Sequence, residues 1–220
     1  MKKESKPYFL LSAGLLLAFV VWTVLLGFVD IAAIGPRDSS VGFAALNGFV
    51  RDLVGVNMTL YTVTDWLGLV PIAVALGFAV FGLVQWIRRK HFLSVDRSIL
   101  LLGGFYLLVM AVYVLFEFVV INRRPVLIEG YLEASYPSST TMLVMCVMPA
   151  AMIEFNKRIK SNALRHSILT VIAVFTAFMV IGRLLSGVHW ISDILGGALF
   201  SVGAVLLYYA SLKAFDCEGK

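Results

Sequence analysis

The residues of this chain that could do chemistry include an arginine, a histidine and an aspartate in the segment GRLLSGVHWISD, residues 182–193. Arg183 precedes His189 by six residues, and Asp193 follows His189 by four. A separation of four places two side chains on one face of a helix. The carboxylate could then fix the tautomer of the imidazole and raise its basicity, which suits a nucleophile. The plain alternative is an interfacial anchor with a helix-capping aspartate.

Two other segments supply groups that suit a phosphate. Arg124-Pro125 ends one long apolar stretch, and residues 137–141, PSSTT, open the next. A helix start offers hydroxyls, free N–H groups and a dipole that favours an anion. Arg124 and Arg183 could each grip a phosphate through paired donors. Each segment alone would be an ordinary cap or boundary anchor, but together they predict phosphoryl transfer through a phosphohistidine. No metal is expected, because arginines can neutralise the developing charge.

The elements that position these groups are membrane helices. The chain has 220 residues, of which 60% are hydrophobic and 14% charged, whereas soluble domains are about 45–50% apolar and about 25% charged. The apolar stretches are too long for barrel strands and do not alternate. They predict an all-α, six-span helical bundle in one integral membrane domain, with spans at about residues 8–29, 62–87, 98–121, 138–155, 166–185 and 188–214.

The positive charges predict how the bundle is oriented. Of the 18 lysines and arginines, 13 lie in the two tails and in the loops near residues 88–97 and 157–165. The other 5 lie on the opposite side. Basic loops stay in the cytoplasm, so both termini, including Lys2 and Lys220, should be cytoplasmic. The segments with the candidate residues should face outward from the plasma membrane. The net charge of +5 is therefore topological and does not indicate nucleic-acid binding.

Residues 46–54 follow the first span and have helical periodicity. Leu46, Phe49 and Leu53 would share one face, and Asn47 and Arg51 the other. The pattern fits an amphipathic helix in the membrane interface or a buried connector between spans. The two cysteines, Cys146 and Cys217, have no metal-ligand spacing and no plausible partner, so we interpret them as structural or incidental.

With these motifs the chain resembles the type-2 phosphatidic acid phosphatases, also called lipid phosphate phosphatases, which share a core with vanadium haloperoxidases. The family motifs are K-x6-R-P, P-S-G-H and S-R-x5-H-x3-D. The third motif keeps Arg183, His189 and Asp193 and replaces only its leading serine, by Gly182. The other two motifs are matched in part, at Arg124-Pro125 and Pro137-Ser138.

The resemblance implies roles for these residues. His189 would be the nucleophile and Asp193 its orienting partner. Arg124, Arg183 and Ser138 would bind phosphate, helped by N–H groups near Ser139. Substrates would be phosphate or pyrophosphate groups on membrane lipids, hydrolysed at the outer surface without a cofactor. Beyond the substrate and the bilayer the sequence names no partner and no oligomeric state.

Two positions depart from the motifs. Glu117 stands where the family has lysine, and Thr140 where it has the histidine that protonates the leaving group. Threonine is no useful acid near neutral pH. Arg123 could replace the missing positive charge, whereas Glu117 could pair with an arginine or be a neutral acid that donates the proton. A leaving phosphate monoester needs less protonation than an alkoxide, so a polyprenyl-type pyrophosphate is favoured over phosphatidic acid.

A second hypothesis comes from a different class of protein. The chain could be a non-catalytic membrane protein that keeps the phosphate site and binds or moves phospholipid. Glu117 and Thr140 favour this hypothesis, and His189 with Asp193 argue against it. A transporter or scaffold unrelated to phosphate would not bring Arg124, Ser138 and His189 together.

Overall fold

The computed structural model describes residues 5–216, and its regular elements are helices. Six helical stretches are long and apolar enough to cross a membrane, which confirms the predicted all-α, six-span bundle. The helices are α1 (Lys6–Leu26), α2 (Ala44–Val54), α3 (Met58–Leu67), α4 (Leu69–Arg89), α5 (Arg97–Phe118), α6 (Ser139–Arg158), α7 (Asn162–Leu185) and α8 (Ile191–Asp216), with short 3-10 turns at Pro36–Asp38 and Phe92–Ser94. Lys2, Cys217 and Lys220 lie outside the described residues.

The second predicted span consists of two helices. Gly68 separates α3 from α4, and its N–H donates to Thr64 and Asp65 at the end of α3. Pro71 follows in the first turn of α4, where a missing N–H does no harm. Because of this break α3 packs against α7 while α4 packs against α5 and α6. The other spans differ from the predicted bounds by a few residues at their ends.

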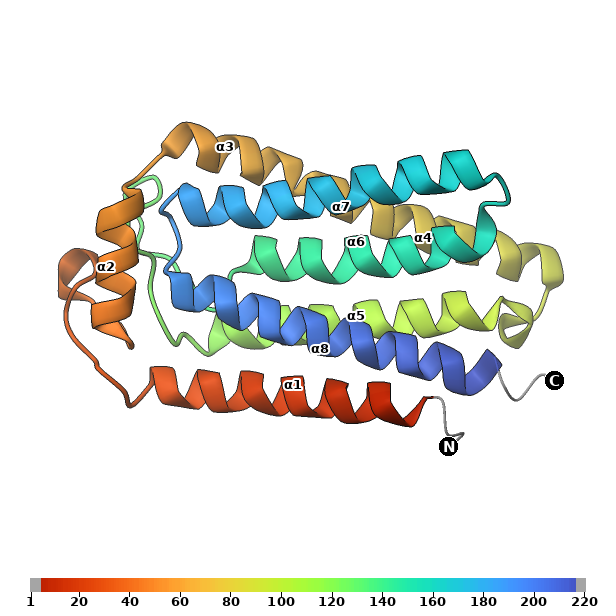
Figure 1. Cartoon of the computed structure of the whole chain (residues 1–220), viewed down its shortest axis with the longest axis horizontal. Helices are drawn as coiled ribbons and strands as arrows, with labels where there is room; N and C mark the ends of the chain where they lie inside the picture. Colours follow the sequence, from red (N-terminus) through yellow and green to blue (C-terminus); the bar gives the residue numbers. More distant parts are fainter. Residues whose placement is uncertain (1–4, 217–220) are drawn as a thin grey trace.

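Helix α8 is the central element of the bundle. It packs against α1, α5 and α6, and α6 in turn packs against α4 and α7. In Figure 1 α1 begins and α8 ends at the same end of the bundle, on the right. At the left end lie α2, the connection from α5 to α6 and the turn from α7 to α8. The fold therefore brings the predicted site segments to one end.

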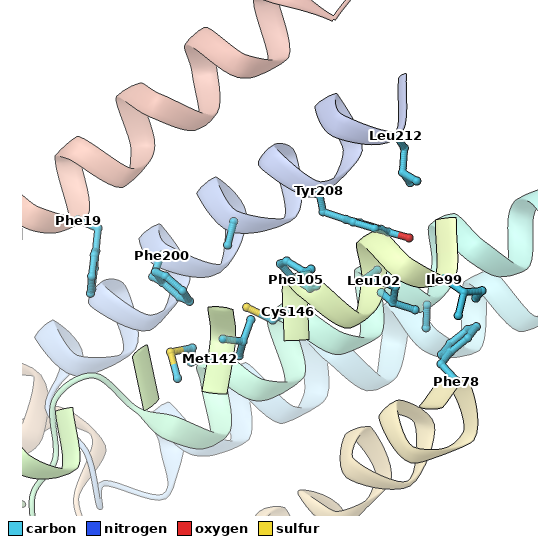
Figure 2. Packing of buried hydrophobic residues seen from close by; sticks show 14 of the residues in the cluster. Phe19, Phe78, Ile99, Leu102, Phe105, Met142, Cys146, Phe200, Tyr208 and Leu212 are labelled. Atoms are coloured by element: carbon cyan, nitrogen blue, oxygen red, sulfur yellow. The ribbon is translucent and has the colours of Figure 1, made fainter. Parts of the chain in front are cut away.

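Close packing of aromatic and small residues holds α8 in place. Figure 2 shows Phe19 of α1 facing Phe200 of α8, and Phe105 of α5 near Tyr208 and Cys146. Cys146 is fully buried. The ring centroids of Phe19 and Phe200 are 5.4 Å apart, and the Ser12 hydroxyl donates to the carbonyl oxygen of Gly203 at 2.8 Å. Such short contacts between small residues drive helix association in lipid, where the hydrophobic effect between helices is weak.

Helix α2 confirms the predicted periodicity. Leu46, Phe49 and Leu53 are exposed, and Asn47 on the opposite face is fully buried. The Asn47 side-chain amide donates to the Ser192 hydroxyl at 3.0 Å, and its oxygen accepts from the Ser192 N–H. The polar face of α2 thus binds the start of α8, and the apolar face points away from the protein.

Candidate active site

The turn between α7 and α8 places the histidine and the aspartate. After α7 ends at Leu185, Gly187 has a φ of +67°, and a Cβ there would collide with the carbonyl oxygen of Gly55. Glycine is therefore required at this close approach. Helix α8 then begins at Ile191, and the Asp193 carboxylate accepts from the N–H of Trp190 at 3.0 Å.

His189 contacts Asp193 chiefly through a third residue, Ser135. Nδ1 of His189 lies 3.8 Å from Oδ2 of Asp193, too far for a direct hydrogen bond. The hydroxyl of Ser135 fills the gap. It donates to Oδ2 of Asp193 at 2.5 Å, and its oxygen lies 3.0 Å from Nδ1 of His189. The predicted pair is thus a buried chain of three side chains.

This chain fixes the tautomer of His189. The single hydroxyl hydrogen of Ser135 is used on Asp193, so the Ser135 oxygen accepts from Nδ1. The carbonyl oxygen of Ser135 also lies 3.2 Å from Nδ1, and a carbonyl can only accept. Nδ1 therefore carries the hydrogen, and Nε2 presents a lone pair, as nucleophilic attack requires.

Burial makes the imidazole neutral. It lowers the pKa of His189 to about 4, and the charges of Arg124 and Arg183 act in the same direction. Asp193 raises the pKa, but by less than burial lowers it. Asp193 thus acts in the expected direction, but the net pKa is lowered, because desolvation and two cations outweigh one carboxylate. At neutral pH His189 is nevertheless in the unprotonated form that can attack.

The carboxylate of Asp193 has further donors. Its Oδ1 lies 3.3 Å from the side-chain amide of Asn122 and 3.4 Å from the hydroxyl of Ser192. Asp193 is fully buried, where an ionised carboxylate persists only with several partners. Asn122 lies two residues before Arg124, so the same network ties the arginine segment to α8.

A two-armed loop between α5 and α6 brings Arg124 and Ser135 together. The N–H of Arg124 donates to the carbonyl oxygen of Glu133 at 3.1 Å, and that of Ser135 to Asn122 at 2.9 Å. Residues 129 and 130, at the tip, both have positive φ, as in the tight turns that join paired strands. Asn122 and Ser135 therefore lie opposite each other, although they are 13 positions apart.

The two arginines flank one aromatic ring. The guanidinium carbon of Arg183 lies 4.9 Å, and that of Arg124 6.0 Å, from the ring centroid of Tyr61 on α3. Nη1 of Arg183 lies 3.5 Å from Asp65, and Nε of Arg124 lies 3.0 Å from Glu133. Both arginines are buried. Two buried cations side by side attract an anion.

The serines at the start of α6 differ in placement. Ser138 is fully buried, and its N–H donates to the carbonyl oxygen of Asp193 at 3.1 Å. It occupies the N-cap position, but its hydroxyl makes no capping hydrogen bond, so the ordinary cap interpretation fails. Thr141 is also fully buried, whereas Ser139 and Thr140 are half-buried.

Unpartnered polar atoms gather in this region. Within residues 5–216, buried side-chain atoms without a hydrogen-bond partner include Nε and Nη1 of Arg124, Nε of Arg183, Oγ of Ser138, Oγ1 of Thr141 and Nε2 of His189. A buried polar atom without a partner costs about 1–3 kcal/mol. Five of these atoms can donate a hydrogen bond, and the sixth is the nitrogen that could attack, so the arrangement suits an anion that accepts the donors.

A cavity of about 510 Å³ opens beside His189. Its lining includes Arg123, Arg124, Glu133, Ser135 and Ser139. Glu117 also lines it, so this departure from the motif lies at the candidate site. Thr140 is absent from the lining, and Arg123 directs its Nη1 to the carbonyl oxygen of Leu132 at 2.9 Å.

Sequence reasoning missed several residues of the site. Ser135, Asn122 and Glu133 lie in a polar loop whose pairing has no strong sequence signal. Asp65 belongs to what looked like one continuous span, and Tyr61 directly precedes the predicted start of that span. Only the nearness of Asn122 to Arg124 could have pointed to a role.

Comparisons with known proteins identify the family and the fold of this chain. A search of curated proteins found no similar sequence. Among solved structures, the chain is similar to a transmembrane PAP2-type phosphatidylglycerolphosphate phosphatase from Bacillus subtilis, with 24% sequence identity and a TM-score of 0.53. The alignment covers 95% of this chain and 97% of that one. The family model of the PAP2 superfamily matches residues 71–216, a range that holds every predicted site residue. The chain is a multi-pass membrane protein that belongs to the PAP2 superfamily.

Proposed function

We propose that this protein is a membrane phosphatase that hydrolyses a phosphate or pyrophosphate group on a lipid through a phosphohistidine intermediate. Family membership supports a phosphatase. The observation that carries the mechanism is that Nε2 of His189 and donors on Arg124, Arg183 and Ser138 are buried without partners, while the charges of both arginines act on the imidazole. A site that only binds phospholipid would not need a histidine held in its nucleophilic tautomer.

In the proposed reaction, substrate oxygens accept from Arg124, Arg183, Ser138 and the free N–H groups of residues 139–141. Nε2 of His189 attacks phosphorus and the leaving oxygen departs. The imidazole then carries positive charge, which the carboxylate of Asp193 stabilises through Ser135. Water hydrolyses the phosphohistidine and restores the neutral ring. The fixed donors stabilise charge that develops on the transferring group, usually the largest single contribution to catalysis.

The substrate class follows from the leaving group. Thr140 stands where the family motif has its proton donor. A leaving phosphate monoester has a second pKa of about 6 and needs little protonation, whereas an alkoxide needs much. We therefore favour a lipid pyrophosphate, of the polyprenyl type, over a lipid monophosphate.

The site is proposed to face outward from the plasma membrane, with both termini cytoplasmic. The support is the distribution of Lys and Arg, 13 against 5. All candidate residues lie at the end of the bundle that has fewer lysines and arginines.

The nucleophile is tested by phosphoenzyme trapping. Acid-labile phosphate should appear on the wild-type protein during turnover and be lost in His189→Ala. Asp193→Asn should retain the fold and lower kcat by about 10⁴-fold, by analogy with loss of the carboxylate in other histidine-dependent sites. Rapid quenching with ³²P-labelled lipid pyrophosphate measures both. Wild-type turnover in His189→Ala would contradict the mechanism.

The bridging serine gives a second test. Ser135→Ala removes a hydrogen bond to the imidazolium, so kcat should fall about 10–100-fold with little change in KM, because Ser135 contacts the histidine. Ser211→Ala is the matched control, since that hydroxyl donates only to its own helix at Leu207. Steady-state kinetics and thermal unfolding of each variant should be measured. Unchanged kcat in Ser135→Ala would show that the bridge has no role in turnover.

Leaving-group preference gives a third test. Wild-type protein should cleave dodecyl pyrophosphate faster than dodecyl monophosphate, and the ratio of the two kcat/KM values should not exceed the roughly 10²–10⁴-fold contribution of acid catalysis. Equal rates would mean that a residue other than Thr140 protonates the leaving group fully. Binding without turnover of either compound would favour the non-catalytic hypothesis.

Orientation is tested by labelling. In a background without Cys146 and Cys217, a membrane-impermeant thiol reagent added to intact cells should label Glu129→Cys in the exposed loop tip. His91→Cys, in the basic loop after α4, should react only after the membrane is opened. The reverse pattern would place the site in the cytoplasm.

A further inference from the structure

We infer that Glu133 is the residue that protonates the leaving group and later deprotonates the attacking water, in place of the histidine that Thr140 replaces. This inference rests on the proposed function, and it names a catalytic residue that the family motifs do not contain.

The first support is position. Oε2 of Glu133 lies 3.0 Å from Nε of Arg124, and Arg124 is proposed to hold the phosphate. Glu133 lines the same cavity as His189, whereas Thr140 is absent from that lining. A phosphate that binds to the unpartnered Nη1 of Arg124 would therefore lie next to the Glu133 carboxylate.

The second support is that Glu133 is held in place. Its carbonyl oxygen accepts from the N–H of Arg124 at 3.1 Å, and the adjoining residues, Arg123 and Ala134, form an antiparallel bridge. The side chain is 43% exposed, so protons can be exchanged with solvent. Glu117 lines the cavity too, but within residues 5–216 the ion pairs of Arg124 and Arg183 are with Glu133 and Asp65, and Glu117 lies on α5.

The third support is the poor hydrogen-bond geometry of the ion pair between Arg124 and Glu133. Although the two atoms are 3.0 Å apart, Nε of Arg124 makes no hydrogen bond of acceptable direction to the carboxylate. An incoming phosphate can compete for such a donor.

The proposed reaction has two displacement steps at phosphorus, and each is accompanied by one proton transfer. Nε2 of His189 forms a bond to phosphorus, the bond from phosphorus to the leaving oxygen breaks, and its electron pair stays on that oxygen. The carboxylic proton of Glu133 passes to the same oxygen. In the second half the Glu133 carboxylate takes a proton from water, whose oxygen bonds to phosphorus as Nε2 departs. One water is consumed, and Glu133 returns to its starting state.

The test compares carboxylate-to-amide variants on two substrates. Glu133→Gln should lower kcat for dodecyl monophosphate until the ratio of the two substrates reaches the roughly 10²–10⁴-fold range expected without an acid. Its kcat for dodecyl pyrophosphate should change by only a few-fold. KM should stay or fall for both, because a charge that competes for Arg124 is removed. Glu117→Gln, in the same cavity, and Glu129→Gln, on the same loop, are the matched controls and should leave the ratio of the two substrates unchanged.

Other outcomes separate the inference from the proposed function. Faster turnover of both substrates in Glu133→Gln would mean that Glu133 only blocks Arg124, and would overturn the inference. A selective loss in Glu117→Gln, or a ratio unchanged in both cavity variants, would also overturn it. The proposed function would survive each result as long as pyrophosphate turnover still depends on His189. If the wild type cleaves neither substrate, both proposals fail.

Discussion

The buried carboxylate of Asp193 is the constraint on which the candidate site depends. It has no exposed surface, and its charge must be balanced by donors inside the protein, because an unpaired buried charge costs several kcal/mol. Those donors come from three places: Ser135 and Asn122 at the two ends of the α5–α6 loop, and Trp190 before α8. A single charge thus joins the segments that carry the arginine, the serines and the histidine.

Packing away from the site offsets the free-energy cost of the buried polar atoms that have no hydrogen-bond partner in the site. Each unpartnered buried donor near His189 costs about 1–3 kcal/mol, and several lie together. The contacts of α1 with α8 and the aromatic cluster around Phe105 and Tyr208 lie along the bundle, and the cluster reaches the cavity lining at Tyr136 and Met142. Rigid helices can therefore hold polar groups apart from one another until an anion binds, and this preorganisation suits electrostatic catalysis.

Most of the fold could be predicted from the sequence, because apolar length alone defines a membrane helix. The break at Gly68 could not, since both halves are apolar and a single glycine is common within spans. The motif spacing predicted that His189 and Asp193 lie near each other, which they do, but His189 lies in the turn before α8 and not on a shared helix face. Ser135 was missed, because its position depends on the pairing of two polar loop arms, and a one-residue shift would turn its side chain away.

The net lowering of the pKa of His189 could not be predicted from the sequence for a related reason. Spacing predicts that Asp193 is near His189, but it contains no information about burial or about the approach of Arg124 from another loop. Those two effects decide the direction of the pKa of His189. The sequence places one charged neighbour, Asp193, four positions from His189. The approach of Arg124 and Arg183 depends on the fold.

The replacement of the motif serine by Gly182 has a structural reason that lies outside the residues matched by the family model. A Cβ at position 182 would approach Cγ2 of Thr64 to 2.8 Å, so Thr64 fills the space that a side chain there would need. The hydroxyl of Thr64 in turn lies 3.4 Å from Nη1 of Arg183. A hydroxyl near the arginine is thus supplied by α3 instead of α7. Together with the Tyr61 ring and Asp65, this makes α3 the element that sets the direction of the Arg183 guanidinium, while its Nε remains available for a phosphate oxygen.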